Sequence, residues 1–309
     1  MDFSCLRDFV ASLSVVDDAG ERATANCLNF LLADLTEQRQ GLSPEEDRAA
    51  KSAFQTALLP FTVESPFCKH VYDRPRGYHG DYVSQEMIWL GRTGGPAHRY
   101  LGATRRGQLL SALTFDMANC RANEARVRIL RGLIRTAGPR VAGIGCRSAI
   151  ELWDYELSGL RTKDLFLLDH DGDALLRARS QIGPTPGCTV RFHKDNVWRF
   201  ALHPPTDLLG ERDLIYVFGL LDYFTPAHCG RILASLRRCL APGGKLVATN
   251  AHPRNPTRLW MEYGGEWYLN YKDEQTMFDL SAAVPDLADV SLLTDDAGVY
   301  QYLALRAKG

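Results

Sequence analysis

The sequence lacks the features that mark several common classes of protein. Its eight cysteines include no C-x-x-C pair and no Cys/His spacing of the zinc kind, which gives no basis for a metal site or a disulfide framework. No apolar run approaches the roughly 20 residues that cross a bilayer. The opening MDFSCLRDFVASL lacks the basic-then-apolar pattern of a secretory signal. We therefore expect free thiols, no bound metal, no membrane partner and a cytoplasmic location.

The chain also has almost no net charge. Its 36 basic residues face 37 acidic residues, which leaves a formal net charge of −1. So balanced a chain offers no overall attraction for phosphate backbones, and a nucleic-acid partner is not expected. With 309 residues, of which 45% are apolar, it can bury one large core or two smaller ones. We expect a monomer or homodimer that acts on a small molecule.

The first part of the chain has the apolar spacing of helices. Apolar residues recur every three or four positions in CLRDFVASL, NCLNFLLADL and RAAKSAFQTALL, and Ser43 followed by Pro44 predicts a helix start. Prolines, glycines and aromatic residues between Pro60 and Gly95 predict an irregular, functional loop region. We expect residues 1–120 to form a helical cap, or lid, over a catalytic domain of residues 121–309.

The second part alternates strand and helix patterns. RVAGIG, KDLFLLDHD, CTVRFHKDN and RDLIYVFGLLDYF have the character of strands, and HCGRILASLRRCL follows as a helix with one apolar face. APGGKLVATNAHP indicates a turn and a strand, and VSLLTDDAGVYQYLALRA a closing hairpin. This order predicts an α/β fold with a Rossmann-like, mostly parallel sheet and an antiparallel edge.

Glycines and acids follow successive strands of that sheet. In a doubly wound sheet, a nucleotide-like ligand binds beyond the carboxyl ends of the strands, where the first turn lets backbone approach it. The turn holds Gly143, Gly145, Cys146 and Arg147, and Asp169 ends the second strand about 24 residues beyond Gly145. A carboxylate there can accept both hydroxyls of a ribose. For the glycine pair alone, a tight turn is an equally good explanation.

Further residues extend the pattern along the sheet. His170 follows Asp169. The pair Asp195 and Asn196 ends the third strand, where an adenine amino group could bind. Phe218 belongs to the segment expected to line the floor of the cofactor site. With the turn LAPGGKL, these motifs resemble the class I S-adenosylmethionine-dependent methyltransferases. The resemblance implies the class I Rossmann-like fold and S-adenosyl-L-methionine as cofactor. The chain has no full G-x-G-x-x-G and no phosphate-cradling loop, which argues against NAD and ATP.

Three longer motifs are similar to one bacterial subgroup of this family. They are RPRGYHGDY, IYVFGLLDYF and NAHPRNPTRLWMEYGGEWYLNYK, and the similarity covers roughly residues 60–305. The best-known members of the subgroup make 3-hydroxy fatty acid methyl esters as quorum-sensing signals. This resemblance implies secondary metabolism and a small acid or acyl-type acceptor, without fixing the substrate. Where the family usually has a G-C-G-P turn, this chain has Gly145-Cys146-Arg147-Ser148, so that Arg147 replaces a glycine.

Methyl transfer asks the protein to align a nucleophile, exclude water and sometimes remove a proton. The aromatic candidates for lining the site of a sulfonium are Tyr78, Tyr82 and Tyr223, because aromatic faces attract its positive charge. Core packing explains each of these tyrosines equally well. We expect Asp81 to contact the amino group of the cofactor's methionine part or the substrate. Its alternative role is to cap a turn.

The segment after the fifth strand adds candidates for the substrate side. Asn250 and His252, with His79 and Arg254, are suited to proton transfer and carboxylate recognition. Arg147 either pairs with Glu151 on a helix surface or holds a carboxylate. The aromatic and acidic residues of 260–267 face a substrate or, more simply, pack against the N-terminal helices.

Three functions stay open at this point. The first is methyl transfer to an oxygen or nitrogen atom. The second is a cyclase on the same fold, in which the cofactor's own amine attacks its γ-carbon, giving azetidine-2-carboxylate and methylthioadenosine. The third is a non-catalytic cofactor-binding protein.

Overall fold

The chain forms two compact units. The first unit comprises Met1–Glu124 together with Arg254–Tyr268, and the second comprises Ala125–Pro253 and Leu269–Gly309. The division lies within one long helix, four residues beyond the border expected at residue 120. Residues 254–268, expected in the catalytic domain, group instead with the helices of the first unit. The computed structural model describes residues 1–16, 20–153, 163–183, 187–204 and 206–309.

The first unit is helical, as the apolar spacing predicted, and its described residues include no strand. Ser43 begins a helix as expected, since its hydroxyl accepts from the Glu46 amide while the Glu46 carboxylate accepts from the Ser43 amide. The helices are α1 (Ser4–Ser12), α2 (Glu21–Arg39), α3 (Pro44–Thr62), α4 (Pro66–Asp73), α5 (Tyr82–Thr93), α6 (Pro96–Arg99), α7 (Arg105–Phe115), α8 (Ala118–Thr136, which continues into the second unit) and a π-helical turn at Trp260–Gly264.

The expectation of an irregular region between Pro60 and Gly95 is wrong, because α4 and α5 lie within it. Ser65 caps α4 by accepting from the Cys68 amide, and Asp81 caps α5 by accepting from the Ser84 amide. Capping side chains thus convert a stretch rich in glycine and proline into two short helices. In the described part of the chain, no helix is both long and apolar enough to cross a membrane.

Residues of the π-helical turn complete the core of the first unit. The Phe54 ring packs edge-on against Trp260 and Tyr263, with ring centroids 6.1 Å and 5.7 Å apart. Tyr263 donates from its hydroxyl to Asp47 Oδ1 over 2.6 Å. The simpler sequence interpretation of this segment, packing against the N-terminal helices, is confirmed. Other buried members of this core are Phe3, Leu6, Val10, Leu28, Leu32, Leu58, Leu109 and Leu113.

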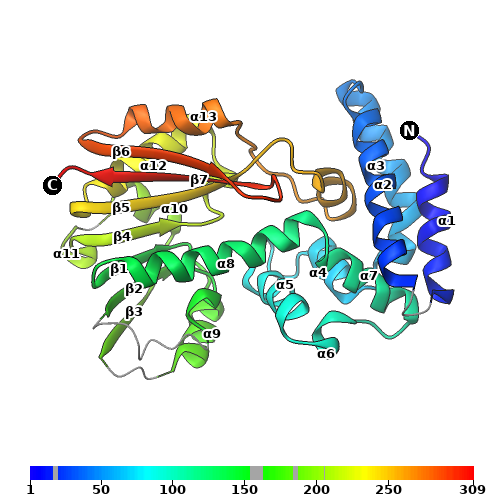
Figure 1. The fold of residues 1–309 in the computed structure, drawn as a ribbon, viewed down its shortest axis with the longest axis horizontal. Helices are drawn as coiled ribbons and strands as arrows, with labels where there is room; N and C mark the ends of the chain where they lie inside the picture. Colours follow the sequence, from blue (N-terminus) through cyan, green and yellow to red (C-terminus); the bar gives the residue numbers. More distant parts are fainter. Residues whose placement is uncertain (17–19, 154–162, 184–186, 205) are drawn as a thin grey trace. The chain divides into compact units, whose positions relative to one another are not determined.

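The described residues of the second unit form one seven-stranded sheet in the order β3-β2-β1-β4-β5-β7-β6, with β3 and β6 at its two edges (Figure 1). The first five strands run parallel, and β7 is antiparallel to both β5 and β6, as the hairpin pattern predicted. The strands are β1 (Arg140–Ile144), β2 (Lys163–Asp169), β3 (Cys188–Lys194), β4 (Arg212–Val217), β5 (Leu240–Ala251), β6 (Leu287–Thr294) and β7 (Tyr300–Ala307).

Apolar side chains from helices and strands meet in the core of this unit. The helices are α9 (Gly172–Ile182), α10 (Val197–Leu202), α11 (Thr206–Leu209), α12 (Pro226–Arg237) and α13 (Glu274–Asp279). Strand residues with long apolar runs, expected for buried parallel strands, supply much of this core. Its members include Ile144, Phe166, Phe200, Ile215, Ile232, Leu236, Leu246, Met277 and Leu303.

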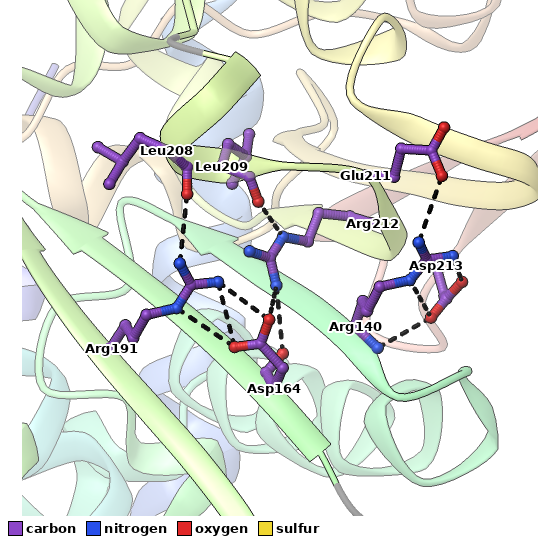
Figure 2. Close-up of polar contacts among 8 residues, drawn as sticks. All are labelled: Arg140, Asp164, Arg191, Leu208, Leu209, Glu211, Arg212 and Asp213. Atoms are coloured by element: carbon purple, nitrogen blue, oxygen red, sulfur yellow. Dashed lines mark hydrogen bonds and ion pairs between the residues drawn. The ribbon is translucent and has the colours of Figure 1, made fainter.

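Charged side chains join β2, β3 and β4, away from the site described below (Figure 2). The Arg212 guanidinium, of which 2% is exposed, donates to Asp164 Oδ2 over 2.9 Å and to the Leu209 carbonyl over 2.6 Å. Arg191 approaches the same carboxylate at 2.9 Å. Asp164 therefore neutralises a buried arginine and ties β2, β3 and β4 together.

This network yields a stability prediction. Removing the carboxylate with Asp164→Ala leaves the buried Arg212 charge uncompensated, and we expect the free energy of unfolding to fall by about 2 kcal/mol in urea denaturation. The matched control is Asp289→Ala, which removes an exposed ion pair in which Asp289 Oδ2 lies 4.0 Å from Arg306 Nη2. This change should lower the free energy of unfolding by less than about 0.5 kcal/mol. Equal effects of the two changes would contradict a special role for Asp164.

Candidate functional site

The turn after β1 is held by the acid at the end of β2. The Asp169 carboxylate, in a residue only 3% exposed, accepts from the Arg147 amide over 2.7 Å and from the Asp171 amide over 2.9 Å. The Leu168 carbonyl accepts from the amides of Gly145 and Cys146 at 2.9 and 3.0 Å. Gly145 itself has a φ of 74°, a conformation that glycine adopts without strain. The predicted turn and acid thus form one structural unit.

The other glycine of the motif serves a close packing contact. A Cβ atom at Gly143 would lie 2.3 Å from the hydroxyl of Tyr216, the neighbouring residue on β4. That hydroxyl donates to Glu151 Oε1 over 2.6 Å. Burial raises the pKa of Glu151 and of Tyr216, and burial raises the pKa of the Cys146 thiol well above its usual value. Cys146 is therefore a neutral thiol rather than a nucleophile.

Arg147 spans from this turn to the end of β4. It is a non-glycine residue with a φ of 52°, and its guanidinium donates to the carbonyls of Phe218 at 3.3 Å and Gly219 at 3.5 Å. The interpretation of Arg147 and Glu151 as a pair on a helix surface is wrong. Glu151 is buried in a short 3₁₀ helix, Ile150–Leu152, and its carboxylate accepts from a tyrosine.

A second arginine, Arg126, is buried and lies beside Arg147. The Arg126 guanidinium, from α8, is 4.7 Å from the centre of the Tyr300 ring. A Cβ atom at Gly219 would lie 2.7 Å from Arg147 Nη2 and 3.1 Å from Arg126 Nη1, so both cations approach the end of β4. Sequence reasoning missed Arg126 because nothing in its helix distinguishes it from its neighbours Arg128 and Arg131.

Polar residues follow β2 and β3 as expected. Asn196 caps α10 by accepting from the Arg199 amide over 3.0 Å, and Asp195 accepts from Arg199 Nη2 over 2.6 Å, which lowers the pKa of Asp195. The Asp195 amide donates to the Asp169 carbonyl over 3.2 Å. His170 Nδ1 lies 3.1 Å from Asp169 Oδ1, and this contact raises the pKa of His170.

The backbone at Gly145 leaves room beside apolar side chains. A Cβ atom there would meet nothing closer than Val197 Cγ1 at 3.8 Å and Leu220 Cβ at 4.0 Å. Two buried hydroxyls of the second unit, Ser148 Oγ and Tyr302 Oη, have no hydrogen-bond partner within the described ranges. The Tyr302 ring packs edge-on against Phe218, with centroids 5.8 Å apart. Unpaired buried hydroxyls are groups that a bound polar ligand would satisfy.

The candidates at the ends of β4 and β5 are held by internal contacts. Asn250 Nδ2 donates to the Ala251 carbonyl at 2.8 Å, and its Oδ1 accepts from Lys272 Nζ at 2.9 Å. His252 Nε2 lies 2.9 Å from Glu274 Oε2. Tyr223 is 39% exposed, the most accessible of the candidates on this edge. Its neighbour Asp222 is buried, which raises its pKa, and it accepts from the Ala251 amide. Their catalytic roles stay predictions.

Three candidates belong to the first unit. Asp81, 1% exposed, caps α5 and accepts from His70 Nε2 at 2.9 and 3.0 Å. Burial opposes ionisation of Asp81, but the hydrogen bonds from His70 and the Ser84 amide outweigh it and lower its pKa. These contacts match the alternative role of Asp81, in which its side chain caps a turn. The Tyr82 ring lies 4.8 Å from the Arg76 guanidinium, and Tyr78 is half-buried.

Comparisons with known proteins identify the fold. No protein-family model and no curated protein matches the chain. Among solved structures, a possible exported protein from Bordetella parapertussis is 17% identical, with a TM-score of 0.57 over 87% of this chain and 100% of its own. Together with the sheet order, this likeness defines a Rossmann-like α/β fold, the class I methyltransferase fold.

Two further matches are methyltransferases solved with bound S-adenosylhomocysteine. The magnesium protoporphyrin IX methyltransferase ChlM from Synechocystis PCC 6803 is 11% identical, with a TM-score of 0.45, over 62% of this chain and 84% of its own. The N-methyltransferase NodS from Bradyrhizobium japonicum WM9 is 18% identical, with a TM-score of 0.43, over 63% and 90%.

The contact between His170 and Asp169 predicts the pKa of His170 and how the stability of the fold depends on pH. In the folded protein His170 should titrate above the ordinary histidine pKa of about 6.5, and Asp169→Asn should return its pKa toward that value. Because the folded pKa is raised, the pair stabilises the fold below about pH 6.5, and this contribution is lost as pH rises through the raised pKa. Histidine NMR titration measures the pKa of His170 in the wild type and in Asp169→Asn.

The matched control is His79 in the first unit. Burial lowers the pKa of His79, so it should titrate below the ordinary value in the wild type and in Asp169→Asn alike. An unchanged His170 pKa in Asp169→Asn would show that the carboxylate is not the cause.

Proposed function

We propose that this chain is an S-adenosylmethionine-dependent methyltransferase whose cofactor binds to the second unit, at the carboxyl ends of β1 to β4. The observation that carries the proposal is the left-handed Gly145 turn, held by Asp169 and bordered by Val197 and Leu220. In open α/β sheets this is the edge at which ligands bind.

The residues on this edge fit the adenosine part of the cofactor. Each Asp169 oxygen has two lone pairs, so the carboxylate can accept ribose hydroxyls while it holds the turn, with His170 beside it. Asp195 and Asn196 are the candidates for the adenine amino group, and Ser148 Oγ is a buried hydroxyl without a partner in the described part of the chain.

The cofactor supplies an activated methyl group when bound, which leaves positioning and the exclusion of water to the protein. Phe218 and Tyr302 present aromatic surfaces suited to a sulfonium charge. Arg147 and Arg126 supply guanidinium groups that can pair with a carboxylate of the cofactor or the substrate.

We propose a small acid or acyl-type metabolite as the acceptor. The observation that favours an acid is that the guanidinium groups of Arg147 and Arg126 both approach Gly219 at the end of β4. The proposed residues of the substrate side in the second unit are Tyr223, Asn250 and His252. The 3-hydroxy fatty acids of the resembling subgroup are the first acceptors to test.

The by-product of the reaction tests this function. Purified protein incubated with S-adenosylmethionine and a panel of hydroxy and acyl acids should form S-adenosylhomocysteine and a methylated acid, both detected by mass spectrometry. Methylthioadenosine formed above the spontaneous rate without any acceptor would contradict methyl transfer. Calorimetry with the cofactor alone checks binding, and a chain that binds without turnover on any acceptor would be a non-catalytic binding protein.

Replacement of Arg147 tests the carboxylate role. Arg147→Gly restores the residue usual in the family and relieves a left-handed non-glycine backbone, so the protein should fold at least as well. We nevertheless expect it to weaken cofactor binding or turnover by at least tenfold, because a charge-assisted hydrogen bond to the carboxylate is lost. Isothermal titration and steady-state kinetics separate the two effects.

Ala149→Gly is the control for backbone strain. Ala149 has a φ of 49° in the same turn and carries no charge, so its change to glycine should alter affinity and turnover by less than about twofold. If Arg147→Gly also stays within twofold, Arg147 binds no carboxylate.

A further inference from the structure

The helical first unit contains a cavity of about 30 Å³, compared with the roughly 10–15 Å³ that one water needs. The π-helical turn at Trp260–Gly264 supplies part of its wall, and such turns are frequent at functional sites. No lining residue is charged. The lining residues with apolar or aromatic side chains are Phe67, Val71, Trp260, Met261 and Trp267, and the others are Thr62, Cys68, Thr114, Asn119, Gly264 and Gly265.

Two polar atoms of the lining residues are buried without a partner. Asn119 Oδ1 is an acceptor and Trp267 Nε1 is a donor, and neither makes a hydrogen bond to any described residue. Each residue is 6% exposed, so solvent at the surface does not satisfy these groups. A buried polar group without a partner destabilises a fold, and native proteins keep few of them.

The indole of Trp267 is fixed in place. Its backbone amide donates to the Met261 carbonyl over 2.9 Å, and its ring stacks on His79 with centroids 6.1 Å apart and an interplanar angle of 9°. His79 Nε2 in turn lies 3.1 Å from the Gly265 carbonyl. The unpaired donor therefore belongs to a rigid side chain rather than to one that turns away to find a partner.

The remaining polar groups of the wall leave the cavity uncharged. Thr114 donates from its hydroxyl to the Leu110 carbonyl over 2.7 Å. Burial raises the pKa of the Cys68 thiol, which keeps it neutral. The residues that line the cavity thus include one unpaired neutral donor and one unpaired neutral acceptor within the described part of the chain.

We propose that this cavity binds the hydroxyl-bearing end of a small apolar alcohol. A hydroxyl both donates and accepts, so it is the smallest organic group that can satisfy Asn119 Oδ1 and Trp267 Nε1 together. The apolar carbons would pack against Phe67, Val71 and Trp260. A carboxylate is disfavoured because it donates no hydrogen bond and would be buried without a cation. This inference does not depend on the cofactor site of the second unit.

Two isomeric probes test the inference on the full chain. 1-Butanol donates and accepts, whereas methyl propyl ether has the same formula and only accepts. Titrations are followed by NMR at the Trp267 indole N–H, identified among the five tryptophans by its absence in Trp267→Phe. We expect 1-butanol to shift this resonance and to bind at least fivefold more tightly than the ether, which leaves Asn119 Oδ1 unpaired.

Variants assign the two partners. Asn119→Leu should bring the alcohol-to-ether affinity ratio close to one, and Trp267→Phe should weaken both ligands, as measured by saturation-transfer NMR. Trp198→Phe, in the second unit, is the matched control and should leave the ratio unchanged. Equal affinities in the wild type, or no shift of the Trp267 resonance by either probe, would overturn the proposal and leave a cavity that holds water only. The wild-type comparison decides even if a variant fails to fold.

Discussion

The hydrogen bonds that the Asp169 carboxylate accepts from two backbone amides are the contacts on which the candidate site depends. An ionised carboxylate that is 3% exposed would be costly if unpaired, and the amides of Arg147 and Asp171 offset that cost. Because one amide follows β1 and the other follows β2, the carboxylate fixes the turn of the first strand to the end of the second. Together with the Leu168 carbonyl, which accepts from the Gly145 and Cys146 amides, this tie holds the turn that carries Gly145 and Arg147.

The same tie makes a non-glycine turn residue possible. A left-handed backbone costs an L-residue about 1–2 kcal/mol, and both Arg147 and Ala149 adopt it here. The hydrogen bond from the Arg147 amide to Asp169 offsets part of that cost. The Arg147 guanidinium donates to the Phe218 carbonyl after β4. A strained residue held by its surroundings is a common feature of functional sites, because the strain persists only where contacts determine the conformation. The arginine at a position where the resembling methyltransferases have glycine thus has a structural consequence at the edge where the cofactor is proposed to bind.

Much of the sheet could be predicted from sequence, because buried parallel strands and their terminal acids leave a local signal. Three features could not be predicted. The helices within residues 60–95 depend on capping by Ser65 and Asp81, which outweighs a composition rich in breakers. The grouping of residues 254–268 with the helical unit depends on partners such as Phe54, some 200 positions away. Arg126 reaches the end of β4 only because α8 continues into the second unit, which no local pattern records.

Both units bury polar side-chain atoms that have no hydrogen-bond partner among the described residues. They include two hydroxyls in the second unit, and an amide oxygen and an indole nitrogen in the first. Folding selects against buried polar atoms without partners, since each has given up hydrogen bonds to water. Ser148 follows β1 and Tyr302 lies on β7, while Asn119 and Trp267 line an uncharged cavity. Each of these four residues has one buried polar side-chain atom that is unpaired within the described residues. Replacing any of them by an apolar residue would remove the penalty, so packing alone does not account for them. Ligand atoms would supply the missing partners, which makes these groups the most informative positions in each unit.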